Sequence, residues 1–319
     1  MNLGQSVFAQ LLQFVPSRHF DYLVDQYGAN YRSHTCSAWS QFVCMEYAQL
    51  TRRHGLRDVA ACINSQRSKQ YRCGLRHPIS RSTLADANER RDWHLFEQLA
   101  QRMVSSALAL YAHARIDNVL VQPLYAMDST VVDFCLKLFP WPHYRSTKAA
   151  IQAHTVLDLN GAIPVMMTIT AGNVADVKLL DALQLPAYSL VVLDRGYIDY
   201  AQLYALTQHR IDLSALAIAQ IYRQRWQIEL FFKWLKQNLN IQHFFGNSEN
   251  AVKSQVWIAI CVYLAAVMTH KTLQISVSLH TLLQILEVNL LEKTSIADLA
   301  SLAIEPMPDH AVSTQRCLF

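Results

Sequence analysis

The stretch Ile221–Leu239, with the sequence IYRQRWQIELFFKWLKQNL, constrains the fold of this chain more than any other part. It contains no proline or glycine, so we expect one long helix. Its polar residues Tyr222, Arg225, Glu229 and Lys236 stand at offsets of 0, 3, 7 and 14. At about 100° per residue they form a stripe roughly 60° wide, while apolar residues on another side anchor the helix. The stripe is either a solvated face with ordinary charge pairs or one wall of a site.

Two stretches upstream of this helix favour a site. Each ends a run of strand-forming residues on an aspartate, LYAMDST at Asp128 and LVVLDRG at Asp194. Carboxylates are hard oxygen ligands suited to Mg²⁺ or Mn²⁺, and close carboxylates repel one another when no cation lies between them. Together with Glu229, the two aspartates predict a phosphoryl-transfer site with two ions. We expect Asp128 to bridge both ions and Asp194 and Glu229 to complete one shell each.

The rest of the polar stripe has residues suited to binding phosphates. Arg225 offers a bidentate contact and Lys236 a point charge, so we expect both to bind phosphates that flank the reacting one. Tyr222 is expected to donate a hydrogen bond to a phosphate.

The order of predicted elements after residue 118 is typical of one α/β fold. Strands are expected at 119–127, 130–138, 151–158, 163–170 and 190–193, and helices at 173–183 and 200–209. Asn160-Gly161 between the third and fourth of these strands is a hairpin signal. This order predicts a ribonuclease-H-like fold, a mixed sheet flanked by helices. The strands that end at Asp128 and Asp194 lie side by side in such a sheet, which brings the two carboxylates together.

Residues 1–118 are expected to be all-helical and carry the basic excess of the chain. They hold 14 Lys and Arg against 9 Asp and Glu, whereas residues 119–319 hold 14 against 15. This imbalance favours a polyanion partner over a merely soluble basic surface. The basic residues concentrate between residues 52 and 91: Arg52, Arg53, Arg57, Arg67, Lys69, Arg72, Arg76, Arg81, Arg90 and Arg91.

Within this region a basic turn precedes a helix that opens SRSTLADANERR, a pattern similar to a helix-turn-helix DNA reader. We expect one helix from about residue 81 to residue 112, capped by Ser80 or Ser82. Any helical bundle yields such helix pairs, so an ordinary bundle is the alternative. The residues expected to approach DNA are Arg72, Arg76, Arg81, Ser82, Thr83 and Asn88.

Composition excludes several classes of protein. With 52% apolar and 16% charged residues among 319, the chain can bury a core and is not disordered. The longest apolar run, Val256–Met268, is too short for a membrane span and predicts a buried helix. No signal peptide is expected, and seven cysteines without CxxC spacing predict reduced thiols in a cytoplasmic protein without a membrane partner.

These residues resemble the insertion-sequence-four family of bacterial DDE transposases. The spacing Tyr222-x2-Arg225-x3-Glu229-x6-Lys236 matches the family's Y-(2)-R-(3)-E-(6)-K pattern, and the stretches MDST and LDRGY are similar to its two aspartate motifs. The resemblance implies metal-dependent cleavage and strand transfer of insertion-sequence ends, which is cut-and-paste DNA transposition. It also implies double-stranded DNA partners (terminal inverted repeats and target DNA), a homodimer on DNA, hairpin formation on the flanking DNA, and a bacterial, nucleoid-associated location.

One departure from the family is the length between the second aspartate and the glutamate. Only 34 residues separate Asp194 from Glu229, where the family places a last strand and a sizeable β-rich insertion. We therefore expect a DDE domain at 119–319 that lacks most of this insertion near residues 211–213 and is weakened by an internal deletion. The rival interpretation is a native short spacing, which a strand at 211–217 would favour.

Two other functions remain open at this stage. One is a catalytically defective transposase remnant that only binds DNA. The other is a nuclease or ribonuclease H, which shares the metal site but explains neither the basic N-terminal domain nor the polar stripe as well.

Overall fold

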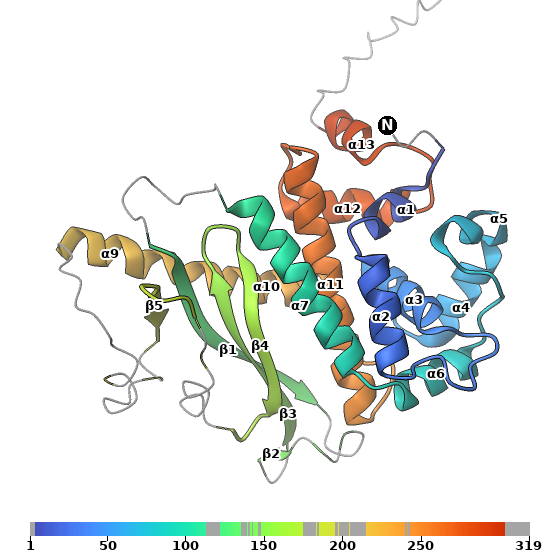
Figure 1. Cartoon of the computed structure of the whole chain (residues 1–319), viewed down its shortest axis with the longest axis horizontal. Helices are drawn as coiled ribbons and strands as arrows, with labels where there is room; N and C mark the ends of the chain where they lie inside the picture. Colours follow the sequence, from blue (N-terminus) through green and yellow to red (C-terminus); the bar gives the residue numbers. More distant parts are fainter. Residues whose placement is uncertain are drawn as a thin grey trace, which may run out of the picture.

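The computed structural model describes residues 4–112, 122–134, 139, 141, 143–145, 148–174, 183, 185–194, 197, 204, 215–239, 241 and 243–303. In them a body of helices stands beside a mixed sheet (Figure 1). The helical body consists of α1 (Val7–Leu12), α2 (Ser17–Gln26), α3 (Ala38–Leu50), α4 (Leu56–Ser65), α5 (Arg67–Gln70), the 3₁₀ turn η1 (Tyr71–Cys73), α6 (Arg81–Arg90), α7 (His94–Tyr111), α11 (Glu249–Thr272), α12 (Leu279–Asn289) and α13 (Ile296–Leu302). Helices from both ends of the chain thus share one body. The expected domain boundary between residues 118 and 119 lies outside the described residues.

Helix α11 forms the centre of this body. It packs against α7, α3, α6 and α12, and the residues Val256–Met268 are all buried, as predicted. The helix is long and apolar enough to cross a membrane, but 94% of its most apolar 18-residue window is buried inside the protein. Its apolar character is therefore that of a core helix.

Serine side chains begin several of these helices. Ser80 accepts a hydrogen bond from the backbone N–H of Thr83 at 3.1 Å, so the predicted cap of α6 is confirmed. The prediction of one helix from residue 81 to 112 is wrong, because α6 ends at Arg90 and α7 begins at His94. Arg91 has the extended angles φ −75° and ψ 131° at the break.

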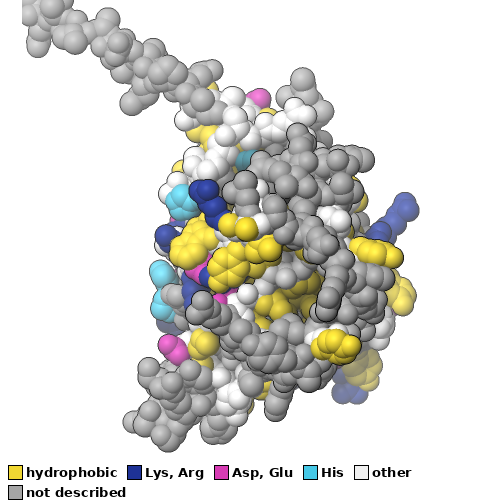
Figure 2. All heavy atoms as spheres, turned by 90° about the vertical axis from the view of Figure 1, so that its left-hand side faces the viewer, with side chains coloured by type: hydrophobic (Ala, Val, Ile, Leu, Met, Phe, Trp, Pro, Cys, Tyr) yellow, Lys and Arg dark blue, Asp and Glu magenta, His cyan; other side chains and the backbone are white. Residues whose placement is uncertain are grey.

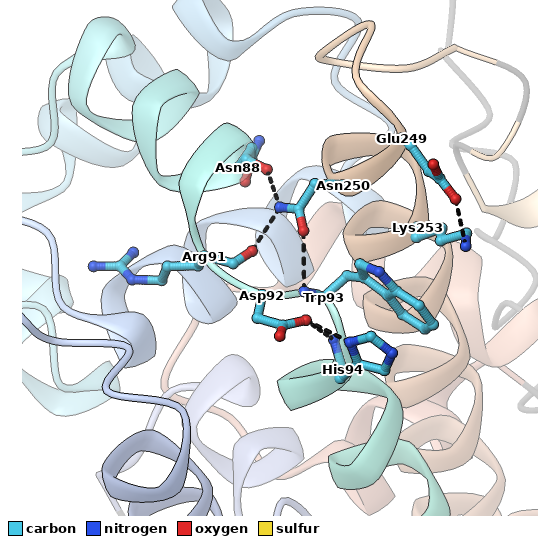
Figure 3. A network of polar contacts seen from close by, with 8 residues as sticks. All are labelled: Asn88, Arg91, Asp92, Trp93, His94, Glu249, Asn250 and Lys253. Atoms are coloured by element: carbon cyan, nitrogen blue, oxygen red, sulfur yellow. Dashed lines mark hydrogen bonds and ion pairs between the residues drawn. The ribbon is translucent and has the colours of Figure 1, made fainter. Parts of the chain in front are cut away.

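The break between α6 and α7 is held by Asn250 of α11 (Figure 3). Its Nδ2 donates to the carbonyl oxygens of Asn88 and Arg91 at 2.8 and 2.6 Å, and its Oδ1 accepts from the N–H of Trp93 at 3.2 Å. These are backbone groups that a continuous helix would have bonded internally. Asp92 Oδ1 then accepts from the N–H of His94, the first residue of α7.

The sheet has β1 (Leu124–Phe134), β2 (His143–Arg145), β3 (Lys148–Asp158), β4 (Ile163–Ala171) and β5 (Leu190–Leu193). Strand β3 is antiparallel to β1, β2 and β4, and β1 is parallel to β5. The predicted hairpin is confirmed, with Asp158 Oδ1 accepting from the N–H groups of Asn160 and Gly161. Two separate strands at 119–127 and 130–138 were expected, but β1 runs unbroken through Asp128 because it pairs with β3 along its length. The helices expected at 173–183 and 200–209 lie mainly outside the described residues.

Helix α10 (Trp226–Asn238) covers one face of the sheet and is preceded by α9 (Ala215–Gln224). The prediction of one helix over 221–239 is therefore wrong at Arg225. This residue keeps helical angles of φ −51° and ψ −33°. Its N–H donates to the carbonyl oxygen of Tyr222, and its carbonyl oxygen accepts from the N–H of Ile228. Both hydrogen bonds span three residues instead of four, so the helix is locally of the tighter 3₁₀ type at this point.

The segment before α9 bears on the rival interpretation of a native short spacing. Residues 215–217, which that interpretation expects in a strand, open helix α9. Residues 205–214, which include the rest of that expected strand, lie outside the described residues.

Candidate active site

Strands β1 and β5 bring Asp128 and Asp194 together. The two strands are parallel, and Met127 lies opposite Leu193 in their register. Asp128 follows Met127 in β1, and Asp194 directly follows the end of β5. The two aspartates are therefore neighbours across the two strands, as the sequence predicted. The prediction that a strand ends at Asp128 is wrong, because β1 continues to Phe134. The two aspartates are neighbours all the same, since β5 ends at Leu193, directly before Asp194.

Both aspartates face helix α10. Side chains alternate between the two faces of a sheet. Ala126 of β1 and Val192 of β5 are buried in the core that also contains Phe231 of α10. Asp128 and Asp194 stand two residues further along and therefore face the same way.

Arg225 connects this edge of the sheet to Glu229. Its Nη2 donates to Glu229 Oε1 at 2.7 Å, and its Nη1 lies 3.8 Å from Asp128 Oδ2. The Arg225 side chain is only 14% exposed, compared with 20% for Asp128 and 35% for Glu229. The guanidinium is thus the cation between two of the three predicted carboxylates.

Burial and neighbouring charge both act on Asp128. Burial raises the pKa of its carboxyl group above the ordinary value, and the charges of Asp194 and Glu229 raise it further. The N–H of Ser129, which donates to Asp128 Oδ1 at 2.7 Å, and the guanidinium of Arg225 oppose this shift without cancelling it. The carboxylates therefore carry more negative charge than Arg225 alone balances.

The same charges act on Arg225. Partial burial acts to lower its pKa, but the hydrogen bond and charge of Glu229 together with the charge of Asp194 outweigh this effect, so its pKa is raised. Arg225 stays protonated in this position.

An open cleft with a volume of about 470 Å³ lies over these groups. Its lining residues are Asp128, Ser129, Thr130, Glu229, Phe232, Lys233, Lys236 and Gln237. Lys236 Nζ donates to the carbonyl oxygen of Val131 at 3.0 Å, and burial lowers the pKa of this lysine although Asp133 acts in the opposite direction. Lys233 and Gln237 were missed by sequence reasoning. Their spacing of four and eight residues from Glu229 was the available signal.

The chemistry of this donor set suits a metal ion, but within the described residues no group of three or more His, Cys, Asp or Glu side chains lies close enough together to hold one. Asp128, Asp194 and Glu229 offer only hard oxygen atoms, which suit Mg²⁺ or Mn²⁺. The negative charges of Asp194 and Glu229, which act on Asp128, would favour a further cation at this place.

An exposed apolar ridge runs along α9 and α10 beside the site. Ile218, Tyr222, Trp226 and Leu230 follow one another at intervals of four residues and are between 50% and 59% exposed. The guanidinium carbon of Arg225 lies 5.8 Å from the centre of the Tyr222 ring. Figure 2, which views the molecule from the side of α9, shows hydrophobic side chains grouped beside basic and acidic ones. Of these residues only Tyr222 had been predicted as a site residue.

The N-terminal basic residues divide into exposed and buried groups. Arg72, Arg76 and Arg81 are exposed, as phosphate contacts require. Asn88 is wrong as a DNA-reading residue, because it is 1% exposed and bonds Gln41 inside the helical body.

Arg91 likewise does not belong to a basic surface. It is buried, and its guanidinium donates to Gln41 Oε1, Ser33 Oγ and the carbonyl oxygens of Ala29 and Cys36. It holds the loop after α2 against the start of α7, which is a structural role.

Two parts of the chain match models of known protein families. Residues 120–213 and 207–265 match the family model described as "Transposase DDE domain", and residues 3–76 match a "Domain of unknown function (DUF4372)". A DDE domain implies a ribonuclease-H-like fold, which agrees with the mixed sheet and its flanking helices.

Similar proteins include three curated ones. The chain is 53% identical over 49 residues to "Putative transposase y4zB" of Sinorhizobium fredii. It is 49% identical over 51 residues to "Probable transposase for insertion sequence element IS5377" of Geobacillus stearothermophilus. It is 45% identical over 47 residues to "Putative transposase for insertion sequence element IS4SA" of Synechocystis. These matches cover 15 or 16% of this chain and 14% of the length of each relative.

Proposed function

We propose that this chain, which belongs to the DDE transposases, cleaves insertion-sequence ends and transfers their strands in cut-and-paste DNA transposition. The observation that carries the proposal is the position of Asp128 and Asp194 on adjacent parallel strands, both facing the helix that bears Glu229. We assign these three carboxylates as the catalytic, metal-binding residues. The Y-(2)-R-(3)-E-(6)-K spacing supports our proposal that the chain is a member of the insertion-sequence-four family.

Asp128, Asp194 and Glu229 would together hold two Mg²⁺ or Mn²⁺ ions. Bound ions supply activation of a water or 3′-hydroxyl nucleophile and charge stabilisation at the leaving oxygen. The chain contributes the positions of the ligands. Paired strands fix the two aspartates, and α10, whose Phe232 and Leu235 line one small pocket with Thr130 and Val132 of β1, fixes the glutamate.

The DNA end would lie in the open cleft and across α9 and α10. Tyr222, Arg225 and Lys236 are assigned to the phosphates of this end. Trp226 and Tyr222 add exposed aromatic rings on which unpaired bases can stack. The segment formed by α9, Arg225 and α10 is basic, which suits binding to DNA. Its charged residues are the basic Arg223, Arg225, Lys233 and Lys236 and the acidic Glu229.

The helical body would hold the terminal inverted repeat through the phosphate contacts of Arg72, Arg76 and Arg81. These residues flank the turn between η1 and α6, where Tyr71 is also exposed. We propose that the protein acts in the bacterial cytoplasm as a homodimer on terminal inverted repeats and target DNA. A dimer would bring two ends of one element together.

The shortening near residues 211–213 is proposed to weaken this activity. The two stretches that match the DDE model overlap at residues 207–213, which is where the sequence predicts the junction of an in-frame deletion. The three curated relatives do not test whether the chain is shortened here, because the match covers only 14% of the length of each.

The test is Mg²⁺-dependent cleavage of double-stranded DNA that carries the two terminal sequences flanking the gene for this chain. Asp128→Ala and Glu229→Ala are expected to abolish cleavage, and wild type to retain it. Asp133→Ala is the matched control, because Asp133 is an exposed acid on the same strand. Cleavage by wild type no greater than that by Asp128→Ala would overturn catalysis and favour a remnant that only binds DNA.

A further inference from the structure

We propose that Arg225 is an internal counterion of the carboxylate site and exchanges with the divalent metal. When no metal is bound, the guanidinium lies between Asp128 and Glu229. When metal binds, Arg225 leaves the carboxylates and turns toward the DNA end. This inference rests on the proposed function in so far as the carboxylates are taken to bind metal.

The geometry gives Arg225 two partners through two different nitrogens. Nη2 donates to Glu229 Oε1 at 2.7 Å, and Nη1 lies 3.8 Å from Asp128 Oδ2. The negative charge of Asp194 also reaches the guanidinium. All three groups assigned as metal ligands therefore act on one arginine, whose side chain is only 14% exposed.

Metal and arginine compete for the same oxygen atoms. Mg²⁺ binds carboxylate oxygens at about 2.0–2.1 Å and requires near-ideal octahedral geometry. A guanidinium nitrogen at 2.7 Å from Glu229 Oε1 occupies one approach to that oxygen. Two cations that share one pocket also repel one another. Movement of the Arg225 side chain away from Glu229 and Asp128 would therefore favour metal loading.

Tyr222 gives the arginine a second contact that does not involve a carboxylate. Its ring centre already lies 5.8 Å from the guanidinium carbon, and the ring is half exposed. A guanidinium stacked on this ring would present its N–H groups to a DNA phosphate. Metal and DNA end would then each favour the binding of the other, since both need Arg225 away from the carboxylates.

The test measures Mn²⁺ affinity by electron paramagnetic resonance of the free ion, with full-length protein and no DNA. Arg225→Gln removes the competing cation. The matched control is Arg223→Gln, which makes the same charge change two residues away at an exposed position. Arg225→Gln is expected to bind Mn²⁺ on the order of tenfold more tightly than Arg223→Gln, given the usual strength of a hydrogen bond to a charged group. Equal or weaker binding by Arg225→Gln would overturn the exchange.

Arg225→Lys is the second variant, in case Arg225→Gln does not fold. It keeps the charge but loses the fork that reaches two carboxylates, so its Mn²⁺ affinity should exceed that of wild type. Affinity equal to or below that of wild type contradicts the proposal.

Asp128→Ala separates the two claims. If Mn²⁺ binding does not depend on Asp128 in any variant, the metal site and the proposed function both fail. If binding depends on Asp128 but is insensitive to Arg225, only the exchange fails. If Arg225→Gln binds more tightly while wild type does not cleave DNA, the exchange stands and the proposed function fails.

Discussion

Lys236 Nζ lies 3.0 Å from the carbonyl oxygen of Val131, so the helix that carries Glu229 is bonded to the strand that carries Asp128. This contact stands at the wall of the open cleft. It joins two carboxylate-bearing elements that lie about 100 residues apart in the chain.

Lys236→Met should therefore impair catalysis. It keeps the apolar stem and removes the hydrogen bond, so we expect a loss of about 1 kcal/mol in the free energy of unfolding. Cleavage of end DNA should fall by at least about tenfold, because Glu229 is no longer held toward Asp128 and the proposed contact of Lys236 with the DNA end is lost. The matched control is Lys233→Met, an exposed lysine one turn earlier in the same cleft. Equal effects of the two substitutions on cleavage would show that lost charge, not lost positioning, is responsible.

The burial of Glu46 leads us to expect that the stability of the protein falls as the pH rises. It is fully buried in α3, neither of its carboxylate oxygens has a hydrogen-bond partner among the described residues, and burial raises its pKa to about 8. The folded protein therefore holds a proton on Glu46 that the unfolded chain releases near its ordinary pKa. The free energy of unfolding should fall as the pH rises from about 4.5 to about 8, by up to about 1.4 kcal/mol per pH unit.

Glu46→Gln should remove this slope, as measured by urea unfolding at a series of pH values. Glu89→Gln is the control, because Glu89 is an exposed acid in the same helical body. A wild-type slope that persists in Glu46→Gln would assign it to another group.

Asn250 is predicted to stabilise the junction between α11 and the break that separates α6 from α7. It makes three hydrogen bonds to backbone groups at the break between α6 and α7. Asn250→Ala leaves those groups unsatisfied and should lower the free energy of unfolding by roughly 2–3 kcal/mol. The exposed Asn247 supplies the control Asn247→Ala, which should cost less than about 0.5 kcal/mol. A similar small loss at Asn250 would contradict the role given to it.

The exposed arginines near α6 should account for much of the salt dependence of DNA binding. Replacing Arg72, Arg76 and Arg81 with Gln should weaken binding and lower the slope of log K against log salt by about three. Filter binding at a series of salt concentrations measures this slope. The matched control replaces three other exposed arginines, Arg18, Arg32 and Arg102. An equal change in both triple variants would mean that only net charge acts.

Much of the site follows from local sequence patterns. Short apolar runs that end on Asp128 and Asp194, with the order of elements between them, were sufficient to predict adjacent strands. The apolar side of Ile221–Leu239 was sufficient to place Glu229 on a helix packed against the sheet. Each inference depends on the side-chain period of one element and on a known connection rule.

The features that escaped prediction depend on contacts between distant segments. The break at Arg91 requires Asn250, which lies 159 residues further along the chain. The bonds of Arg225 to Asp128 and of Lys236 to Val131 likewise join separate elements. Arg91 and Asn88 carry polar side chains that a sequence pattern assigns to the surface, whereas hydrogen bonds to buried groups hold both inside. Period and propensity contain no information about such partners.

The central claim is that Asp128, Asp194 and Glu229 hold metal at one place, and iron-directed cleavage of the protein backbone tests it most directly. Fe²⁺ would take the place of Mg²⁺, and with ascorbate and peroxide it cuts the chain close to where it is bound. Mass spectrometry should find cuts grouped near residues 128, 194 and 229, lost in Asp128→Ala and kept in Asp133→Ala. Cuts elsewhere, or cuts unchanged in Asp128→Ala, would contradict a metal site formed by these three carboxylates.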